Sequence, residues 1–184
     1  MNTTTECAPA RVAAWLLPDD VLLDVEVRDV DQALAKAASH IAAMHRLDPA
    51  PIVRALARRE QVGSTGIGQA VALPHARIGG IVRPLVLFLR ARDPIDFAAP
   101  DGRLVRLIMV ILVPQDGDPE EHLQLLATVA QLFCERDFRL QLAQVPDAAA
   151  ARAVFAEWAA RVAAAPPAPA SPARKSAPSA RSAR

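Results

Sequence analysis

Apolar residues recur along this chain with two different periods, and the change of period separates helices from strands. A 3.6-residue repeat predicts a helix that is capped by Asp29 or Asp31 and ends before Pro49. A second helix is predicted from Pro49 or Pro51 to about residue 61. The apolar positions of the first helix are Val30, Leu34, Ala37, Ile41 and Met44.

The segments around these helices alternate or run apolar, as strands do. Residues 21–27 alternate and predict a strand, and Trp15, Leu16 and Leu17 before it are expected to pack onto the domain edge. After the glycine-rich loop 63–68, residues 70–73 predict a short strand that ends at Pro74-His75. His75 is therefore expected at the end of a strand.

The longest apolar runs predict a buried hairpin. Residues 82–90 and 103–113 are the strands, and Pro100-Asp101-Gly102 is the turn between them. Asp118-Pro119 followed by two glutamates is typical of a helix start. Further helices are predicted at about 136–143 and 147–163, the latter burying Ala151, Val154, Phe155 and Trp158. This order of elements predicts an α/β fold, a single domain with a mixed sheet flanked by helices in an α/β/α sandwich.

Length and composition set the domain limits. A chain of 184 residues suits one domain, which we place at residues 15–163 after an N-terminal extension, residues 1–14. Residues 164–184 contain five prolines, four of the 21 basic residues and no acid, and lack apolar periodicity, which predicts a disordered tail. The rest is mildly acidic, so nucleic acid is not an expected partner.

The sequence shows neither a membrane-spanning or targeting segment nor a pattern of disulfide-forming cysteines. No apolar run approaches the roughly 20 residues that cross a bilayer, and no signal peptide precedes the domain, so we expect a cytoplasmic protein without membrane insertion. Cys7 and Cys134 are too few for a disulfide framework and are expected to be free thiols.

Several kinds of chemistry are disfavoured by the residues. Gly66 and Gly68 begin like a dinucleotide fingerprint, but Val71 replaces the third glycine, and no Walker lysine follows any glycine loop. A sharp connection between a helix and a strand, with positive φ angles, is instead predicted at Gly63, Gly66 and Gly68. The functional alternative to this structural role is that the backbone N–H groups of the loop face an anion. The four histidines lack metal-ligand spacing, so neither a metal nor a cofactor is expected.

The remaining pattern matches a known family. Four segments resemble the type-2 enzyme IIA domain of the bacterial phosphoenolpyruvate-dependent phosphotransferase system, nearest its nitrogen-regulatory branch. They are Arg59-Glu60, the run from Gly63 to Gly68, Ala72-Leu73-Pro74-His75 and His122-Leu123. His75 follows Arg59 by 16 residues and precedes His122 by 47. The resemblance covers about residues 15–160 and implies a mixed sheet flanked by helices.

The resemblance also implies the chemistry. His75 would accept a phosphoryl group on Nε2 from a phosphorylated HPr-like carrier and pass it on, which makes the protein a phosphotransferase-system component that acts chiefly as a regulator. A neutral imidazole is a competent nucleophile when its other nitrogen is held as an N–H donor. Arg59 is expected to neutralise phosphoryl charge and His122 to support the phosphoryl group. The loop residues Ser64, Thr65, Gly66 and Gly68 are expected to support the site, with a loop-structural role for the two hydroxyls at least as well favoured as anion binding.

Partner identity is less determined than chemistry. The chain departs from the usual nitrogen-branch pattern at Gln69, Ala70, Ala76 and Arg77, which affects partner preference more than the nucleophile. Regulated targets such as a potassium transporter or a sensor kinase are what the nitrogen branch suggests. The alternatives are a sugar-specific IIA that feeds a fructose- or mannitol-type IIB, and a non-catalytic binding module. Ile67, Leu73 and Ile78 are the expected apolar contacts for a small carrier.

Overall fold

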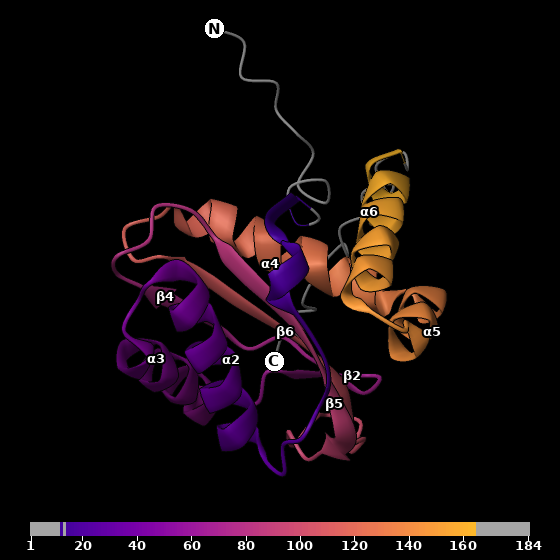
Figure 1. Ribbon diagram of the computed structural model, residues 1–184, viewed down its shortest axis with the longest axis horizontal. Helices are drawn as coiled ribbons and strands as arrows, with labels where there is room; N and C mark the ends of the chain where they lie inside the picture. Colours follow the sequence, from indigo (N-terminus) through magenta and orange to yellow (C-terminus); the bar gives the residue numbers. More distant parts are fainter. Residues whose placement is uncertain (1–11, 13, 165–184) are drawn as a thin grey trace, which may run out of the picture.

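The computed structural model describes residue 12 and residues 14–164, in which one mixed sheet lies between two groups of helices (Figure 1). This arrangement confirms the predicted α/β fold. Nearly all of the predicted N-terminal extension, and the predicted tail from residue 165 onward, lie outside the described residues. The elements in chain order are η1 (Pro18–Asp20), β1 (Val21–Val25), α2 (Val30–His45), α3 (Pro49–Val62), β2 (Gly66–Gly68), β3 (Val71–Ala72), β4 (His75–Ile78), β5 (Leu85–Ile95), β6 (Val105–Pro114), α4 (Pro119–Cys134), α5 (Arg136–Gln144) and α6 (Ala148–Ala164).

The strands of the described residues lie in the order β1-β5-β6-β3-β2, and β4 also pairs with β6. The predicted hairpin is confirmed, because β5 and β6 pair antiparallel. β3 and β4 both run parallel to β6 and keep one register along it, since Val71 lies opposite Leu107 and His75 opposite Ile111. The two short strands therefore form one interrupted edge, with the interruption at Leu73 directly before Pro74.

Each face of the sheet has its own apolar core, because side chains of a strand alternate between faces. On β6, Val110 and Leu112 join the core under α2 and α3, whereas Met109 and Ile111 join the core under α4, α5 and α6. A strand buried on both faces must be apolar at nearly every position, which explains its continuous apolar run. Burial of each large side chain contributes about 1.5–3 kcal/mol.

Capping side chains determine where the helices begin. The Asp29 carboxylate accepts the backbone N–H of Gln32, so Asp29 and not Asp31 caps α2. Asp118 caps α4 by accepting the N–H of Glu120 at 2.9 Å, directly before a proline in the first turn. These bonds satisfy amide groups that have no partner within the helix.

Some expectations about individual positions are wrong. Met44 is 45% exposed, because the buried stripe of α2 relies on alanines near Leu34 and Ile41. Val82 is 97% exposed and precedes β5, which begins at Leu85 and continues beyond the predicted end to Ile95. Leu17 at the domain edge is also exposed, while Leu16 before it is buried. His75 begins β4 instead of ending the strand before it, because the Leu73-Pro74 interruption separates β3 from β4.

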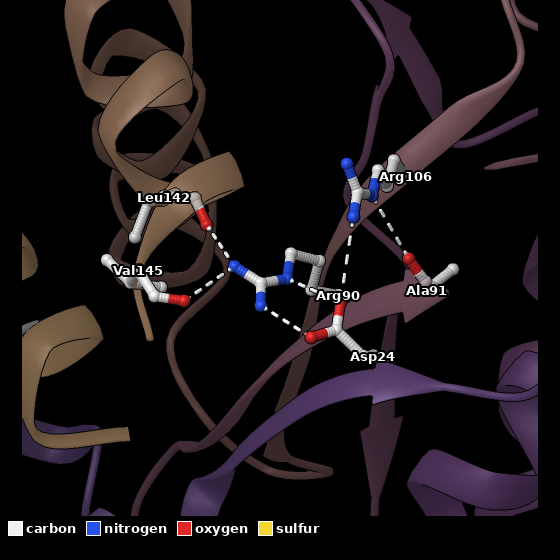
Figure 2. Close-up of polar contacts among 6 residues, drawn as sticks. All are labelled: Asp24, Arg90, Ala91, Arg106, Leu142 and Val145. Atoms are coloured by element: carbon white, nitrogen blue, oxygen red, sulfur yellow. Dashed lines mark hydrogen bonds and ion pairs between the residues drawn. The ribbon is translucent and has the colours of Figure 1, made fainter. Parts of the chain in front are cut away.

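A buried arginine joins the sheet to the turn between α5 and α6 (Figure 2). Arg90 donates from Nε and Nη2 to the Asp24 carboxylate at 3.0 and 2.7 Å. Its Nη1 donates to the carbonyl oxygens of Leu142 and Val145 at 3.1 and 2.9 Å. Arg106 also lies 3.6 Å from Asp24, and the pKa of the Asp24 carboxyl is lowered chiefly by its hydrogen bond with Arg90. The clamp holds the helical layer of α5 and α6 against β1 and β5.

Candidate active site

His75 lies at the start of β4, where the edge of the sheet passes between α3 and α4. Ala76 and Ile78 of β4 join the core under α2 and α3, so the alternation of the strand directs His75 toward the opposite face. Arg59 approaches the histidine from the last turn of α3, and His122 approaches it from the first turns of α4. The structure thus brings together the three residues that the sequence predicted for the chemistry.

Both ring nitrogens of His75 have defined partners. Nδ1 lies 2.8 Å from the carbonyl oxygen of Leu73, and a carbonyl only accepts, so Nδ1 carries the proton. The Nε–H of Arg59 donates to Nε2 at 3.0 Å, so Nε2 presents its lone pair. Burial lowers the pKa of His75 from its ordinary 6.5, and the positive charge of Arg59 lowers that pKa further, while the Leu73 carbonyl opposes both. The resting ring is a neutral Nδ1–H imidazole whose Nε2 lone pair faces a guanidinium.

Arg59 is held in place by a second contact. Its Nη1 donates to the carbonyl oxygen of Gly63 at 2.8 Å, one turn further along the chain. That carbonyl follows the end of α3, where a cation is also favourable to the helix dipole. The side chain is therefore anchored at the helix end while its Nε reaches His75.

His122 lies beside the ring of His75 without a polar contact of its own at Nε2. The ring centroids are 5.8 Å apart at an interplanar angle of 71°. Nε2 of His122 is buried and has no hydrogen-bond partner within the part of the chain that the structure describes. Burial lowers the pKa of His122, as do the neighbouring His75 and Arg77 when charged. A buried polar atom without a partner, on a ring that lies beside His75, is free to bond to a polar ligand of the site.

The loop between α3 and β3 bonds chiefly to itself. The Ser64 hydroxyl donates to the carbonyl oxygen of Phe97 and accepts the N–H of Gly66 at 2.9 Å. Thr65 is buried and bonds to Glu60 through both its N–H and its hydroxyl. These groups are already bonded to the loop itself, to Glu60 of α3 and to Phe97, which favours the loop-structural role of the two hydroxyls over a cradle for an anion.

The glycines of this loop serve different purposes. Only Gly68 among the three has a positive φ, +85°, so the expectation of positive φ is wrong for Gly63 and Gly66. At Gly66 a Cβ atom would lie 2.9 Å from the Cβ of Ala99, so close packing excludes a side chain there. Gly63 has an extended φ of 164° and open space around it.

Arg77, two residues after His75 on β4, fixes the connection before α4. Its Nη1 donates to the carbonyl oxygens of Gln115 and Gly117 at 3.3 and 2.8 Å. Arg77 and His122 both line a groove of about 650 Å³ between that connection and the segment before β5. The groove adjoins His122, but His75 is not part of its wall.

The other titratable candidates lie elsewhere. His40 contacts the carbonyl oxygen of Asp19 at 2.5 Å, and His45 lies 3.9 Å from the carboxylate of buried Asp20. Cys134 is free and exposed, and Cys7 lies outside the described residues. Within residues 12 and 14–164, no group of three or more His, Cys, Asp or Glu side chains has a geometry that could hold a metal ion. No helix there is long and apolar enough to span a bilayer.

Sequence reasoning did not assign a role to Glu60. It was noted only as the neighbour of Arg59, although its carboxylate closes the loop that leads to His75. A glutamate five residues before a threonine has no distinctive spacing, so only the folded loop reveals the pairing.

Comparison with known proteins agrees with this geometry. The chain is 36% identical over 141 residues to a nitrogen regulatory protein of Pseudomonas aeruginosa, covering 76% of this chain and 91% of that protein. A fructose-specific EIIA component of Haloferax volcanii is 35% identical over 103 residues, or 56% of this chain and 66% of that protein. The crystal structure of IIA-Ntr from Neisseria meningitidis superposes with a TM-score of 0.74 at 34% identity, covering 79% of this chain and 99% of that one. The family described as phosphoenolpyruvate-dependent sugar phosphotransferase system, EIIA 2, matches residues 15–158, and this chain belongs to that family.

Proposed function

We propose that this protein is a regulatory phosphocarrier that takes a phosphoryl group on Nε2 of His75 from a phosphorylated HPr-like carrier. The Nε2 lone pair attacks phosphorus, the bond between phosphorus and the donor breaks, and its electron pair returns to the donor. The proton stays on Nδ1, bonded to Leu73. Phosphoryl transfer needs positioning and charge neutralisation more than covalent assistance, and this site supplies both.

One observation carries the proposal, namely that the contacts of His75 assign its two nitrogens different roles. A nucleophilic imidazole must be neutral and must present a lone pair. Because the pKa of His75 is lowered, the ring is neutral near pH 7.

Arg59 and His122 complete the proposed site. When phosphorus occupies Nε2, the Arg59 guanidinium loses its ring contact and can turn its N–H groups to the phosphoryl oxygens. The buried nitrogen of His122 would then gain an acceptor, if it carries the proton, and the N-terminal half-turn of α4 adds a favourable dipole.

The carrier-binding surface differs from the sequence expectation. Leu73 and Ile78 are buried, so they cannot offer apolar contacts, while Ile67 is exposed. Val62 at the end of α3 and Leu123 beside His122 are also exposed. We now propose these three exposed residues as the apolar contacts for the carrier. Val62 and Leu123 are each close in sequence to a site residue.

A regulatory role is favoured over sugar transport by the extent of similarity. The nitrogen regulatory protein of Pseudomonas aeruginosa is matched over 91% of its length, whereas the fructose-specific EIIA component is matched over 66%. A potassium transporter or sensor kinase as target, and a cytoplasmic location, are part of the same proposal.

The experiment is incubation with phosphoenolpyruvate, enzyme I and an HPr-like carrier, followed by intact-mass measurement. We expect an acid-labile gain of about 80 Da, the mass of one phosphoryl group, that is lost in His75→Ala. No gain in the unmodified chain would favour a non-catalytic binding module, and a full gain in His75→Ala would place the phosphoryl group elsewhere. Efficient transfer onward to a sugar-specific IIB would support the sugar-transport alternative.

A further inference from the structure

A series of hydrogen bonds links both nitrogens of His75 to two adjacent residues at the end of α3. On one side, Arg59 donates directly to Nε2. On the other side, Nδ1 donates to the carbonyl oxygen of Leu73, whose own N–H donates to the carbonyl oxygen of Thr65 at 3.0 Å. Thr65 in turn donates to Glu60, the residue after Arg59. The contacts close a ring that passes through the histidine.

The connection between Glu60 and Thr65 uses both oxygens of the carboxylate. Oε1 accepts the backbone N–H of Thr65 at 2.9 Å, and Oε2 accepts its hydroxyl at 2.5 Å. Thr65 is only 4% exposed, so water has little access to replace these bonds. Hydrogen bonds to an ionised acceptor are stronger than neutral ones, and this pair joins the last turn of α3 to a residue five positions further along the chain.

The position of the pair suggests more than loop closure. Leu73 supplies the carbonyl that determines which nitrogen of His75 carries the proton, and its backbone is tied to Thr65. Glu60 is bonded through the main chain to Arg59, so a shift of the last turn of α3 would move the guanidinium relative to Nε2. The negative charge of Glu60 also opposes the lowering of the His75 pKa by Arg59.

We propose that Glu60 and Thr65 are positioning residues for phosphoryl transfer: they set the place of Arg59 against Nε2 and hold the Leu73 carbonyl that keeps the proton on Nδ1. Neither residue touches the phosphoryl group. The inference rests on the proposed function for its kinetic consequence, but the tautomer of His75 is a property of the resting protein and can be measured without any transfer.

The test replaces Thr65 by valine, which keeps the branched shape and the backbone N–H but removes the hydroxyl. Thr128→Val in α4 is the matched control, because Thr128 is partly buried and its hydroxyl has no hydrogen-bond partner among the described residues. Single-turnover transfer from the phosphorylated HPr-like carrier is measured at several carrier concentrations. Imidazole ¹⁵N chemical shifts of His75 report the tautomer in the unphosphorylated protein.

We expect Thr65→Val to lower the maximal transfer rate about tenfold or more, since small misplacements of reacting groups have effects of that order. The carrier concentration at half-maximal rate should change less than twofold, because Thr65 is buried beneath the surface. The ¹⁵N shifts should move from a single Nδ1–H form toward a mixture of tautomers. Thr65→Ser restores the hydroxyl and should recover most of the rate.

Transfer by Thr65→Val at the rate of Thr128→Val, or an unchanged Nδ1–H tautomer, would overturn the inference. A change confined to the half-saturating carrier concentration would also overturn it, since that result indicates carrier binding. If Thr65→Val does not fold, Glu60→Gln provides the same test, because glutamine keeps one acceptor oxygen. Absence of phosphorylation in the unmodified protein would refute the proposed function, while the tautomer comparison would still decide the role of the pair.

Discussion

Replacement of Arg59 by alanine removes the cation that lies 3.0 Å from Nε2 of His75, the nitrogen that we propose accepts the phosphoryl group. In the resting site this cation donates one hydrogen bond to a neutral ring. In the transition state the same guanidinium faces phosphoryl oxygens that carry negative charge, so it stabilises the transition state more than the resting site. A hydrogen bond to a charged group is worth about 1.5–3 kcal/mol net. At about 1.4 kcal/mol for each factor of ten, the single-turnover rate should fall about 10- to 100-fold.

Two smaller effects accompany this loss: the first raises the transfer rate, and the second lowers it at acidic pH. Loss of the resting contact frees the Nε2 lone pair, and it removes a positive charge that lowers the pKa of His75. The freed lone pair favours attack, so we expect the lower half of the calculated range. The higher pKa increases the protonated fraction of the ring below about pH 7, which makes a measurement above that pH the cleaner one.

The assay is rapid-quench transfer from the phosphorylated HPr-like carrier at pH 8, with Arg58→Ala as the matched control. Arg58 is exposed and neighbours Arg59 on α3. Circular dichroism should show the same fold, since Arg59 otherwise bonds only to the carbonyl oxygen of Gly63 among the described contacts. Equal rates for Arg59→Ala and Arg58→Ala, or unfolding of Arg59→Ala alone, would refute the reasoning and make Arg59 a structural residue.

Four further predictions concern pH and stability. The pKa of His75 and that of His122 are lowered below the ordinary 6.5, so the transfer rate should stay constant as pH falls to 6.5 and decline only below it; a midpoint above 6.5 would contradict this. Because the unfolded chain then binds more protons, the free energy of unfolding should also decrease as pH falls below about 6.5, as urea titrations can measure. Ala70 has a φ of +62° in the β2–β3 turn, so Ala70→Gly should stabilise the protein by about 0.5–1 kcal/mol in urea unfolding. The control is Ala156→Gly at an exposed position of α6, which should destabilise the protein by about 1 kcal/mol. Arg90→Met leaves the carbonyl oxygens of Leu142 and Val145 without their donor and should cost about 3 kcal/mol in thermal unfolding, while the exposed Arg92→Met should cost less than about 1 kcal/mol; equal losses would contradict the clamp shown in Figure 2.

The helices could be predicted from the sequence because their ends are determined by local contacts. Asp29 and Asp118 cap α2 and α4 through bonds within three residues, so the signals lie next to one another in the chain. The exposure of Met44 and Val82 could not be predicted, since an apolar period does not reveal where a helix or strand leaves its neighbour. The continuation of β5 beyond Arg90 could not be predicted either. Arg90 is buried because it bonds to Asp24 and Leu142, and these partners lie 52 or more residues away in the sequence.

The sequence predicted which residues form the site, but it did not predict the contacts between them. Arg59, His75 and His122 were identified by their order and spacing within the resemblance, and the structure places them together. The pairing of Glu60 with Thr65 depends on the path of the loop, which the glycine pattern alone does not determine. The protonated nitrogen of His75 was implied only by the resemblance, and the identity of its partner, the Leu73 carbonyl, is known only from the structure.

That carbonyl orientation follows from the position of β4 at the edge of the sheet. Along the interrupted edge formed by β3 and β4, Pro74 turns its carbonyl oxygen toward β6, where it accepts the N–H of Ile111 at 2.9 Å. Successive backbone groups of a strand point in opposite directions, so the groups of Leu73 point away from β6. The N–H of Leu73 meets the loop at Thr65, and its carbonyl oxygen is left without a strand partner because β2 begins only at Gly66. An unpaired edge carbonyl is ordinarily an opportunity for another strand to pair, but here the His75 side chain occupies it. If β2 included Thr65, the N–H of Thr65 would pair with the Leu73 carbonyl; instead that N–H bonds to Glu60, which leaves the carbonyl to hold Nδ1 of His75 while Nε2 faces Arg59.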